Sequence, residues 1–485
     1  MKISILHISD LHRDPNNPIS NEALLNSLIQ DVENAATEDP AIPPTQIVIV
    51  SGDIIHGTGK DTENADAVLR GQYDEAEAFL GALADRLLGG DRRKMIIVPG
   101  NHDINFPRMF SALKNIDYMQ GDDKRRKQLA DLIWEQQSNY RWSWGEFKLY
   151  EIDDEEAYDN RLAEFMDFYA RFYGGERQYS NDPTEQFDIF DFPDLELVVC
   201  GFNSCFLNDP WNRQGAIHPQ AFSKACERLR NRQFRGRLRL AVWHHSTKGA
   251  PSNDDYMDTD FLQQLINHGY SLGFHGHQHE PELINEKFAF GGDRKVNALS
   301  ASTLAGGEDA LSAGGKRGYN RVVLDTDEWT VDLHVRQMVN PNFQNPIWGK
   351  GFLPSQESLQ TFALQQPRQI DHATIASQDL PEAEALLREG NHQEAITILE
   401  PIAERHEMAR RLLLEAFVVG ENNVGIIRWF SEPVSPEEII AVCDALWEEG
   451  KHDELKSILT RPLVADHQDP SVVHIRTKLL GRLGA

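Results

Sequence analysis

The sequence predicts a layered α/β (α+β) fold over residues 1–340 and a smaller all-helical domain over residues 372–485. Three observations support this prediction. Short apolar runs of strand length alternate with amphipathic helical patterns along the first region. Polar residues suited to catalysis directly follow four of those runs. In the second region, glycine recurs at a spacing of 30 residues between helical segments.

The predicted strands of the first region are short and mostly apolar. They are Ile3–Ile8, Gln46–Val50, Met95–Val98, Leu195–Gly201, Leu238–Trp243, Ser271–His275, Val296–Ser300, Arg321–Leu324 and Trp329–Arg336. Helical patterns lie between them, as at Ala23–Ala35, Tyr73–Leu88 and Pro219–Arg230. In layered folds of this kind, functional sites gather at the carboxyl ends of the strands.

Residues 104–190 interrupt this alternation and read as a helical, aromatic-rich insertion between two strands. Phe165, Tyr169, Phe172 and Tyr173 recur at the spacing of one helix face. We expect them to form the hydrophobic core of the insertion. The alternative is a platform on which nucleic-acid bases stack above the active site.

The remainder of the chain divides into a linker and a repetitive helical domain. Residues 341–371 carry Pro, Gln and Gly without periodicity, which is typical of a linker. The segments 385–399 and 445–459 match in register, and Gly390, Gly420 and Gly450 recur where helices are expected to end. Residues 372–485 therefore resemble a short tetratricopeptide-like array, whose concave surface would bind a protein partner. The alternative is a helical bundle that only docks on the first domain.

Composition excludes several classes of protein. The chain has 485 residues, too many for one compact domain, and its 40% hydrophobic and 26% charged residues are typical of a globular protein. It contains no apolar run long enough to span a membrane and begins with no signal-peptide pattern. Four cysteines are too few for a disulfide framework, so we expect a cytoplasmic location.

The charge balance also limits the possible partners. The 48 basic and 76 acidic residues give a net charge of −28. So acidic a protein is not expected to coat nucleic acid through non-specific backbone contacts. It could still cleave nucleic acid if metal ions supplied the positive charge at the site.

Five short segments, in order along the chain, contain the combination of residues that a divalent-metal site needs. They are Asp10-Leu11-His12, Gly52-Asp53, Gly100-Asn101-His102-Asp103, His244-His245 and Gly276-His277-Gln278-His279. Imidazole, carboxylate and amide donors suit divalent cations such as Mn²⁺, Fe²⁺ or Zn²⁺, and the lack of cysteine argues against a structural zinc site. Residues at positions i and i+2 of an extended chain point the same way, and a lone carboxylate such as Asp53 can bridge two ions.

This ordered set of motifs resembles the calcineurin-like metallophosphoesterase superfamily, in particular its bacterial phosphodiesterase and nuclease branch. The resemblance covers residues 1–340 and implies a β-sandwich flanked by helices with two divalent metal ions. Mn²⁺ is the expected ion, with Fe²⁺, Zn²⁺ or Mg²⁺ as alternatives. It further implies that one ion is held by Asp10, His12 and His279, the other by Asn101, His244 and His277, and that Asp53 bridges them.

The same resemblance suggests catalytic roles for two neighbouring residues. His102 would be the general acid, and Asp103 would orient its loop or raise the basicity of a nearby histidine. Many family members have proline where this chain has Ser246, which leaves open whether His244 or His245 binds metal. The candidate substrate contacts are Arg13, Asn203 and His245.

We therefore expect hydrolysis of a phosphodiester bond, in nucleic acid or in a nucleotide or cyclic nucleotide, by metal-activated water. A phosphomonoesterase or nucleotide hydrolase is the first alternative. The second is a regulatory protein that docks a partner through its helical repeats, with hydrolysis gated by that partner. The Asn101-His102-Asp103 motif differs from the Asn-His-Glu of the serine/threonine protein phosphatases, so that branch is not expected.

Overall fold

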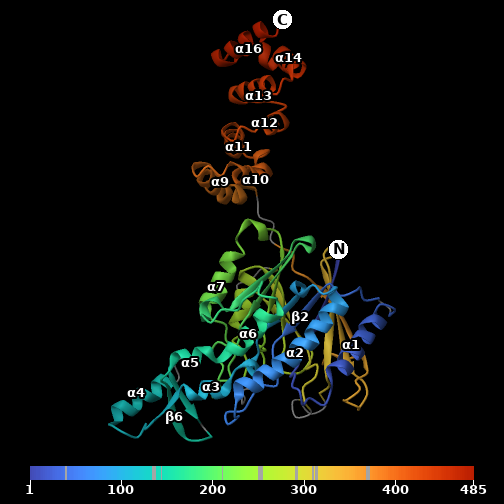
Figure 1. Ribbon diagram of the computed structural model, residues 1–485, viewed down its shortest axis with the longest axis vertical. Coiled ribbons are helices and arrows are strands. Elements are labelled where there is room, and N and C mark those ends of the chain that lie inside the picture. Colours follow the sequence, from blue (N-terminus) through green and yellow to red (C-terminus); the bar gives the residue numbers. More distant parts are fainter. Residues whose placement is uncertain are drawn as a thin grey trace. The chain divides into compact units, whose positions relative to one another are not determined.

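A computed structural model shows that the chain forms two compact units, Met1–Arg368 and Gln369–Ala485, here called the first unit and the helical unit (Figure 1). The structure describes residues 1–38, 41–133, 138–143, 145–209, 211–249, 255–289, 293–307, 311, 315–367 and 372–484. Among the described residues, no helix is both long and apolar enough to cross a membrane.

Two β-sheets form the centre of the first unit. The first sheet has the order β15-β14-β13-β1-β2-β3, and β16 also pairs with β14. Its strands are β1 (Lys2–Ile8), β2 (Ile47–Ser51), β3 (Met95–Val98), β13 (Gly318–Asp325), β14 (Thr330–Met338), β15 (Trp348–Lys350) and β16 (Leu359–Ala363). The second has the order β11-β12-β10-β9-β8-β7. Its strands are β7 (Phe187–Phe192), β8 (Leu197–Phe202), β9 (Leu238–Val242), β10 (Tyr270–His275), β11 (Glu282–Lys287) and β12 (Lys295–Ser300).

Alternation of side chains along the strands builds the layers. In β8, Leu197 and Val199 join the core shared with the first sheet, whereas Val198 and Cys200 join a separate core on the opposite face. The helices α1 (Asn21–Ala35) and α2 (Ala65–Leu88) cover the first sheet, and α7 (Pro219–Arg228) and α8 (Asp260–Asn267) cover the second. The predicted layered α/β fold is confirmed.

The insertion after β3 differs from the purely helical expectation. It contains α3 (Phe106–Ser111), α4 (Asp123–Ile133), α5 (Glu155–Asp159) and α6 (Ala163–Phe172), but also a three-stranded antiparallel sheet of β4 (Leu113–Ile116), β5 (Tyr140–Ser143) and β6 (Lys148–Ile152). In Figure 1, α4 and β6 project from one end of the first unit. These strands are short and half-exposed, so they lack the apolar pattern from which a strand is recognised.

The aromatic face of α6 belongs to the hydrophobic core. Phe165, Tyr169, Phe172 and Tyr173 are all at most 5% exposed and pack in the main core of the first unit. The Tyr173 hydroxyl donates a hydrogen bond to the carbonyl oxygen of Met95 at 2.6 Å. A base-stacking platform on this face is therefore wrong, because the rings are covered by the protein itself.

The segment expected to be a linker adds strands to the first sheet. Within residues 341–367, β15 pairs with Arg336–Met338 and β16 pairs with Thr330–His334, both antiparallel to β14. Backbone pairing with β14 and burial of Trp348 in the main core hold these short strands, neither of which is long enough to show a strand pattern in the sequence. Residues 368–371, at the end of that segment, lie outside the described residues.

The helical unit consists of consecutive helices with their own core. They are α9 (His372–Arg388), α10 (His392–Ala403), α11 (Glu407–Val419), α12 (Asn423–Trp429), α13 (Pro436–Glu448), α14 (His452–Thr460), α15 (Pro462–Ala465) and α16 (Pro470–Arg482). Gly390 and Gly450 end helices with φ of +81° and +67°, whereas Gly420 adopts φ of −77°. The middle copy, which is degenerate in sequence, therefore also ends its helix differently.

Candidate metal centre

The predicted donor residues lie at the carboxyl ends of five strands, β1, β2, β3, β9 and β10, where the two sheets meet the same edge of the first unit. The backbone there is unusual. Five donors adopt the left-handed region, with φ between +44° and +75°, namely Asp10, His12, Asp53, His277 and His279. Such conformations cost of order 1–3 kcal/mol each in a residue other than glycine and tend to mark functional sites.

A first donor group contains Asp10, His12, Asp53 and His279. One ligand atom from each lies within 4.8 Å of all the others, and three of the four residues are buried. The Nε2 atom of His279 lies 3.0 Å from Asp10 Oδ1 and 3.4 Å from His12 Nε2. The four donor atoms therefore converge on one point.

A second donor group contains Asn101, His244 and His277. Asn101 Oδ1 lies 2.9 Å from His277 Nδ1 and 3.1 Å from His244 Nε2, and the two ring nitrogens are 3.3 Å apart. The Oδ2 atom of Asp53 is 3.3 Å from His244 Nε2 and 4.0 Å from His12 Nε2. Asp53 thus lies between the two groups and reaches both.

The protonation of these groups suits metal binding. Burial lowers the pKa of His12 to about 3 and that of His277 to about 4, so both rings are neutral and keep a lone pair at neutral pH. Burial also opposes charge on His244, but the carboxylates of Asp53 and Asp10 raise its pKa to about 9. Despite its own burial, Asp53 has a pKa well below its usual value because of His244 and His102. His12 and His277 therefore offer lone pairs directly, whereas His244 must give up a proton when a cation binds, which makes binding at the second group depend on pH.

His102 stands at the open side of the donor groups, with 39% of its side chain exposed. Its backbone N–H donates to Asp53 Oδ1 at 2.8 Å, and its ring packs edge-on against His12 with 4.6 Å between centroids. Its Nδ1 lies 2.7 Å from the carbonyl oxygen of His56. Because a carbonyl only accepts, Nδ1 carries a proton, and Nε2 is the atom free to gain or lose one.

Asp103 does not take part in this exposed site, since it is 1% exposed. Its Oδ2 accepts hydrogen bonds from the backbone N–H groups of Gly100 and Ile54 at 2.7 and 3.3 Å, and its Oδ1 accepts one from the Tyr73 hydroxyl at 2.9 Å. Burial, reinforced by the charge of Asp53, raises its pKa to about 7. Of the two expected roles, orienting the loop agrees with these contacts, whereas its described partners include no histidine.

The three residues expected to contact substrate, Arg13, Asn203 and His245, are all buried at 1% exposure or less, and each is engaged by other groups of the protein. The Arg13 guanidinium donates to the carbonyl of Ile19 and pairs with Glu75. The Asn203 side chain is occupied by Gln186 and by the backbone N–H of Cys205. His245 contacts Ser204 and Asn208, and its ring packs 4.6 Å from that of His277. His244, rather than His245, thus reaches the donor groups.

Two residues close to the donor groups were not predicted from the sequence. His56 provides the carbonyl that fixes the His102 ring, and the Oδ2 atom of Asp255 lies 3.9 Å from His277 Nε2. His56 follows Asp53 by only three positions, and this closeness to a predicted metal ligand could have indicated that it lies near the site. Asp255 lies in a polar loop with no motif, so only the fold brings it to the site.

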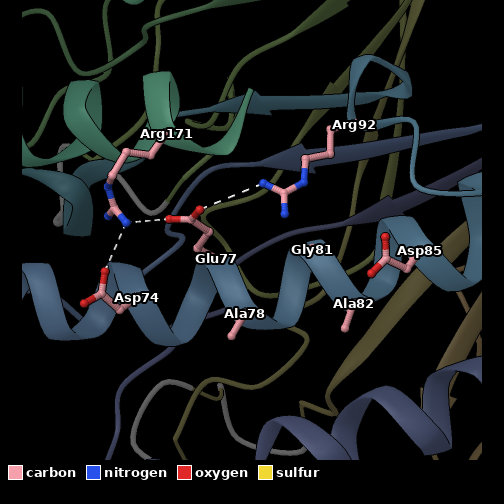
Figure 2. A pocket seen from close by; sticks show the side chains of 8 residues that line it. All are labelled: Asp74, Glu77, Ala78, Gly81, Ala82, Asp85, Arg92 and Arg171. Carbon is pink, nitrogen blue, oxygen red and sulfur yellow. Dashed lines mark hydrogen bonds and ion pairs between the residues drawn. The ribbon is translucent and has the colours of Figure 1, made fainter. Parts of the chain in front are cut away.

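A hollow of about 520 Å³ lies elsewhere, on the surface of α2 and α6 (Figure 2). Figure 2 shows Arg171 reaching Asp74 and Glu77, and Arg92 reaching Glu77. The lining includes none of the predicted site residues, and carboxylates neutralise both arginines. The hollow therefore adds nothing to the donor groups.

The layered fold and the paired donor groups define the class of phosphoester hydrolases. A model of the calcineurin-like phosphoesterase family matches residues 3–281, and the protein belongs to that family. No curated protein matches the chain.

The similar solved structures are distant. A conserved protein of Streptococcus pneumoniae TIGR4 is 9% identical over 75% of this chain and 98% of its own, with a TM-score of 0.24. Zinc-bound Vps29 of Entamoeba histolytica is 8% identical over 74% and 99%, with a TM-score of 0.26. Phosphopantetheinyl hydrolase of Mycobacterium tuberculosis is 17% identical over 62% and 90%, with a TM-score of 0.23. Family membership therefore rests on the sequence match.

Proposed function

We propose that the protein is a metal-dependent phosphodiesterase that acts on nucleic acid or on a nucleotide. The observation that carries this proposal is the sharing of Asp53 between two donor groups, beside a half-exposed histidine. Two-ion hydrolysis of phosphate esters needs such a shared carboxylate and an accessible proton donor.

In this proposal, Asp10, His12 and His279 hold one divalent ion, Asn101, His244 and His277 hold the other, and Asp53 contacts both. Mn²⁺ is the ion proposed, and the donor set of imidazole nitrogens and oxygens without sulfur also accepts Fe²⁺ or Zn²⁺. Such ions supply positive charge against the phosphoryl oxygens and make a water molecule acidic enough to attack phosphorus.

His102 provides the proton for the leaving group. Its Nδ1–H is held by the His56 carbonyl, so the proton that it transfers resides on Nε2. Its exposed side chain can reach a leaving oxygen that lies outside the donor groups. A sugar hydroxyl is a poor leaving group unless it is protonated, so a proton donor matters most for nucleotide diesters.

The charges around the site favour a diester over a monoester. Among the described residues, the side chains of Asp53, Asn101 and His244 make their hydrogen bonds and ion pairs with histidines, with each other and with the backbone rather than with arginine or lysine. The nearby guanidinium of Arg13 is turned away toward Glu75. A diester carries one negative charge and a monoester about two, so the diester depends less on cationic side chains.

A comparison of two simple substrates tests the proposal. The metal-free chain is supplied with Mn²⁺, and hydrolysis of bis-p-nitrophenyl phosphate is compared with that of p-nitrophenyl phosphate, followed by DNA, RNA and cyclic nucleotides. We expect Mn²⁺-dependent cleavage that prefers the diester and falls to background in Asp53→Asn. Asp61→Asn, an exposed change of the same type on the same loop, should leave turnover unchanged. A monoester preference or metal-independent turnover would contradict the proposal.

We further propose that the helical unit docks a protein partner. Large apolar side chains are exposed on it, including Val419 at 57%, Val424 at 67% and Val434 at 71%. The described core residues of this unit lie between Ala383 and Leu479, so it has a hydrophobic core of its own. A chain lacking residues 372–485 should therefore hydrolyse bis-p-nitrophenyl phosphate at the full rate and fail to bind the partner. A large loss of turnover in that truncated chain would instead indicate a structural role for the helical unit.

A further inference from the structure

Between β9 and α8, the described residues place Asp255 beside His277 of the second donor group. The backbone N–H of Met257 donates to the carbonyl oxygen of Ser246 at 2.7 Å, and the Met257 side chain is buried at 2% exposure. The backbone of Gly249 passes close to Asp255, since a Cβ on Gly249 would lie 2.9 Å from Asp255 Oδ1. These contacts hold Asp255 beside the site even though it is remote from every sequence motif.

Asp255 faces the imidazole of His277 on the side away from the donor group. Its Oδ2 lies 3.9 Å from His277 Nε2, and the two side chains are 21% and 13% exposed. His277 Nε2 and Asp255 Oδ1 are both buried atoms without a hydrogen-bond partner. An unsatisfied buried polar group typically costs about 1–3 kcal/mol, so His277 Nε2 gains from a hydrogen bond to the Asp255 carboxylate, whose Oδ2 lies 3.9 Å away.

The tautomer of His277 follows from its other nitrogen. Nδ1 faces Asn101 Oδ1 at 2.9 Å and His244 Nε2 at 3.3 Å, so it is the atom directed into the second donor group. A nitrogen that donates its lone pair to a metal carries no proton, and the single proton of the neutral ring then resides on Nε2. That proton points toward Asp255.

We propose that Asp255 is a positioning residue that accepts the Nε2–H of His277 and thereby fixes the ring with Nδ1 directed at the metal. This inference rests on the proposed function of the same site. Closing 3.9 Å to the roughly 2.9 Å of a hydrogen bond requires a movement of about 1 Å, which a side-chain rotation provides. Contacts of this kind typically change metal affinity by about 10–100-fold.

The test measures metal binding rather than turnover. Mn²⁺ is titrated into the metal-free full-length chain against a competing chelator, in wild type, Asp255→Ala, Asp255→Asn and Asp258→Asn. Asp258 is an exposed residue of the same loop, so its variant controls for the loss of one negative charge. We expect Asp255→Ala to weaken one of two binding sites by about 10–100-fold. Asp255→Asn should weaken it less, because its amide oxygen still accepts a hydrogen bond, and Asp258→Asn should match wild type.

A second readout uses the chain loaded with diamagnetic Zn²⁺, in which Nδ1 carries no proton. Proton and nitrogen-15 chemical shifts of the His277 Nε2–H group report its hydrogen bonding, and we expect a hydrogen-bonded, downfield Nε2–H in wild type that moves upfield in Asp255→Ala. Unchanged Mn²⁺ affinity in Asp255→Ala, or an equal loss in Asp258→Asn, would overturn the inference. Normal Mn²⁺ binding by wild type without diester hydrolysis would overturn the proposed function instead, so the two failures are distinguishable.

Discussion

Glycines occupy turns in both units of the protein, but their surroundings differ. At the donor groups, a Cβ on Gly276 would meet Ser9 and Asp10, and a Cβ on Gly100 would meet Asp53. In the helical unit, Gly390 and Gly450 have positive φ, and a Cβ on either would meet nothing within 4 Å. Gly276 and Gly100 therefore let the backbone approach donor side chains, whereas Gly390 and Gly450 end helices in open surroundings.

Gly276→Ala provides the strongest test of this difference. The added methyl would lie 2.8 Å from the Ser9 Cβ and closer still to Asp10 Oδ2, so it must displace a donor. We expect diester turnover to fall to background and the free energy of unfolding to fall by about 1–3 kcal/mol, as in other overpacked sites. Turnover with bis-p-nitrophenyl phosphate and thermal unfolding measure the two effects.

The matched control for that variant is Gly71→Ala, in the middle of α2, where a Cβ would meet nothing within 4 Å. It should keep full turnover and gain up to about 1 kcal/mol of stability, since alanine favours a helix. If Gly276→Ala retained normal turnover, close approach would not explain the glycines of the site.

His102→Ala should reduce turnover without reducing the stability of the first unit. The side chain is 39% exposed, so its loss should leave the melting temperature unchanged while turnover falls by about 10²–10⁴-fold. The loss should be larger for an alkoxide leaving group than for p-nitrophenolate, which leaves without a proton. Equal losses for the two kinds of leaving group would show that His102 donates no proton.

Asp103→Asn tests stability against pH. Burial, with the charge of Asp53, raises the pKa of Asp103 to about 7, so the folded protein binds a proton there that the unfolded chain has released. This group therefore favours folding at low pH, and its contribution is lost as the pH rises from about 4 to about 7. Relative to wild type, metal-free Asp103→Asn should become progressively more stable over that interval. Denaturant titrations at several pH values measure the difference, which should not vary with pH if Asp103 is ionised throughout.

Gly390→Ala should have the smallest effect. Its φ of +81° costs an alanine about 1 kcal/mol, and the open space around it adds no clash. We expect the helical unit to lose about that much stability in thermal unfolding while turnover stays at the wild-type value. A reduced rate of hydrolysis in this variant would show that the helical unit supports the catalytic site.

The fold class and the donor residues could be predicted from the sequence because each depends on short stretches of neighbouring residues. Each donor follows an apolar run, as Asp10 follows β1 and His244 follows β9, and strand ends meet at one edge of a layered fold. The helix-ending role of Gly390 is equally local. The resemblance to the family then gave each donor residue its expected role in metal binding, and the experiments proposed above test those roles.

Features that depend on contacts between distant parts of the chain could not be predicted from the sequence. Arg13 pairs with Glu75, a residue far away in the sequence, and this contact turns the Arg13 guanidinium away from the donor groups. No residue pattern near Arg13 indicates that orientation. The strands β15 and β16 exist because β14 offers them backbone partners. The placement of Asp255 depends on the Ser246–Met257 contact, which no pattern of residue types reveals.

The position of β1 has a consequence for synthesis of the protein. This strand pairs with β2 on one side and, through Ile5 and Val322, with β13 on the other. At translation rates of roughly 5–20 residues per second, its second neighbour leaves the ribosome about 15–60 s after the first strand. During that time β1 can pair with β2, but its other apolar edge lacks β13 and the donor groups lack His277 and His279 for most of the interval. Nascent chains should therefore depend on chaperones until residue 325 has emerged, and truncated messages should yield aggregates rather than partial enzymes.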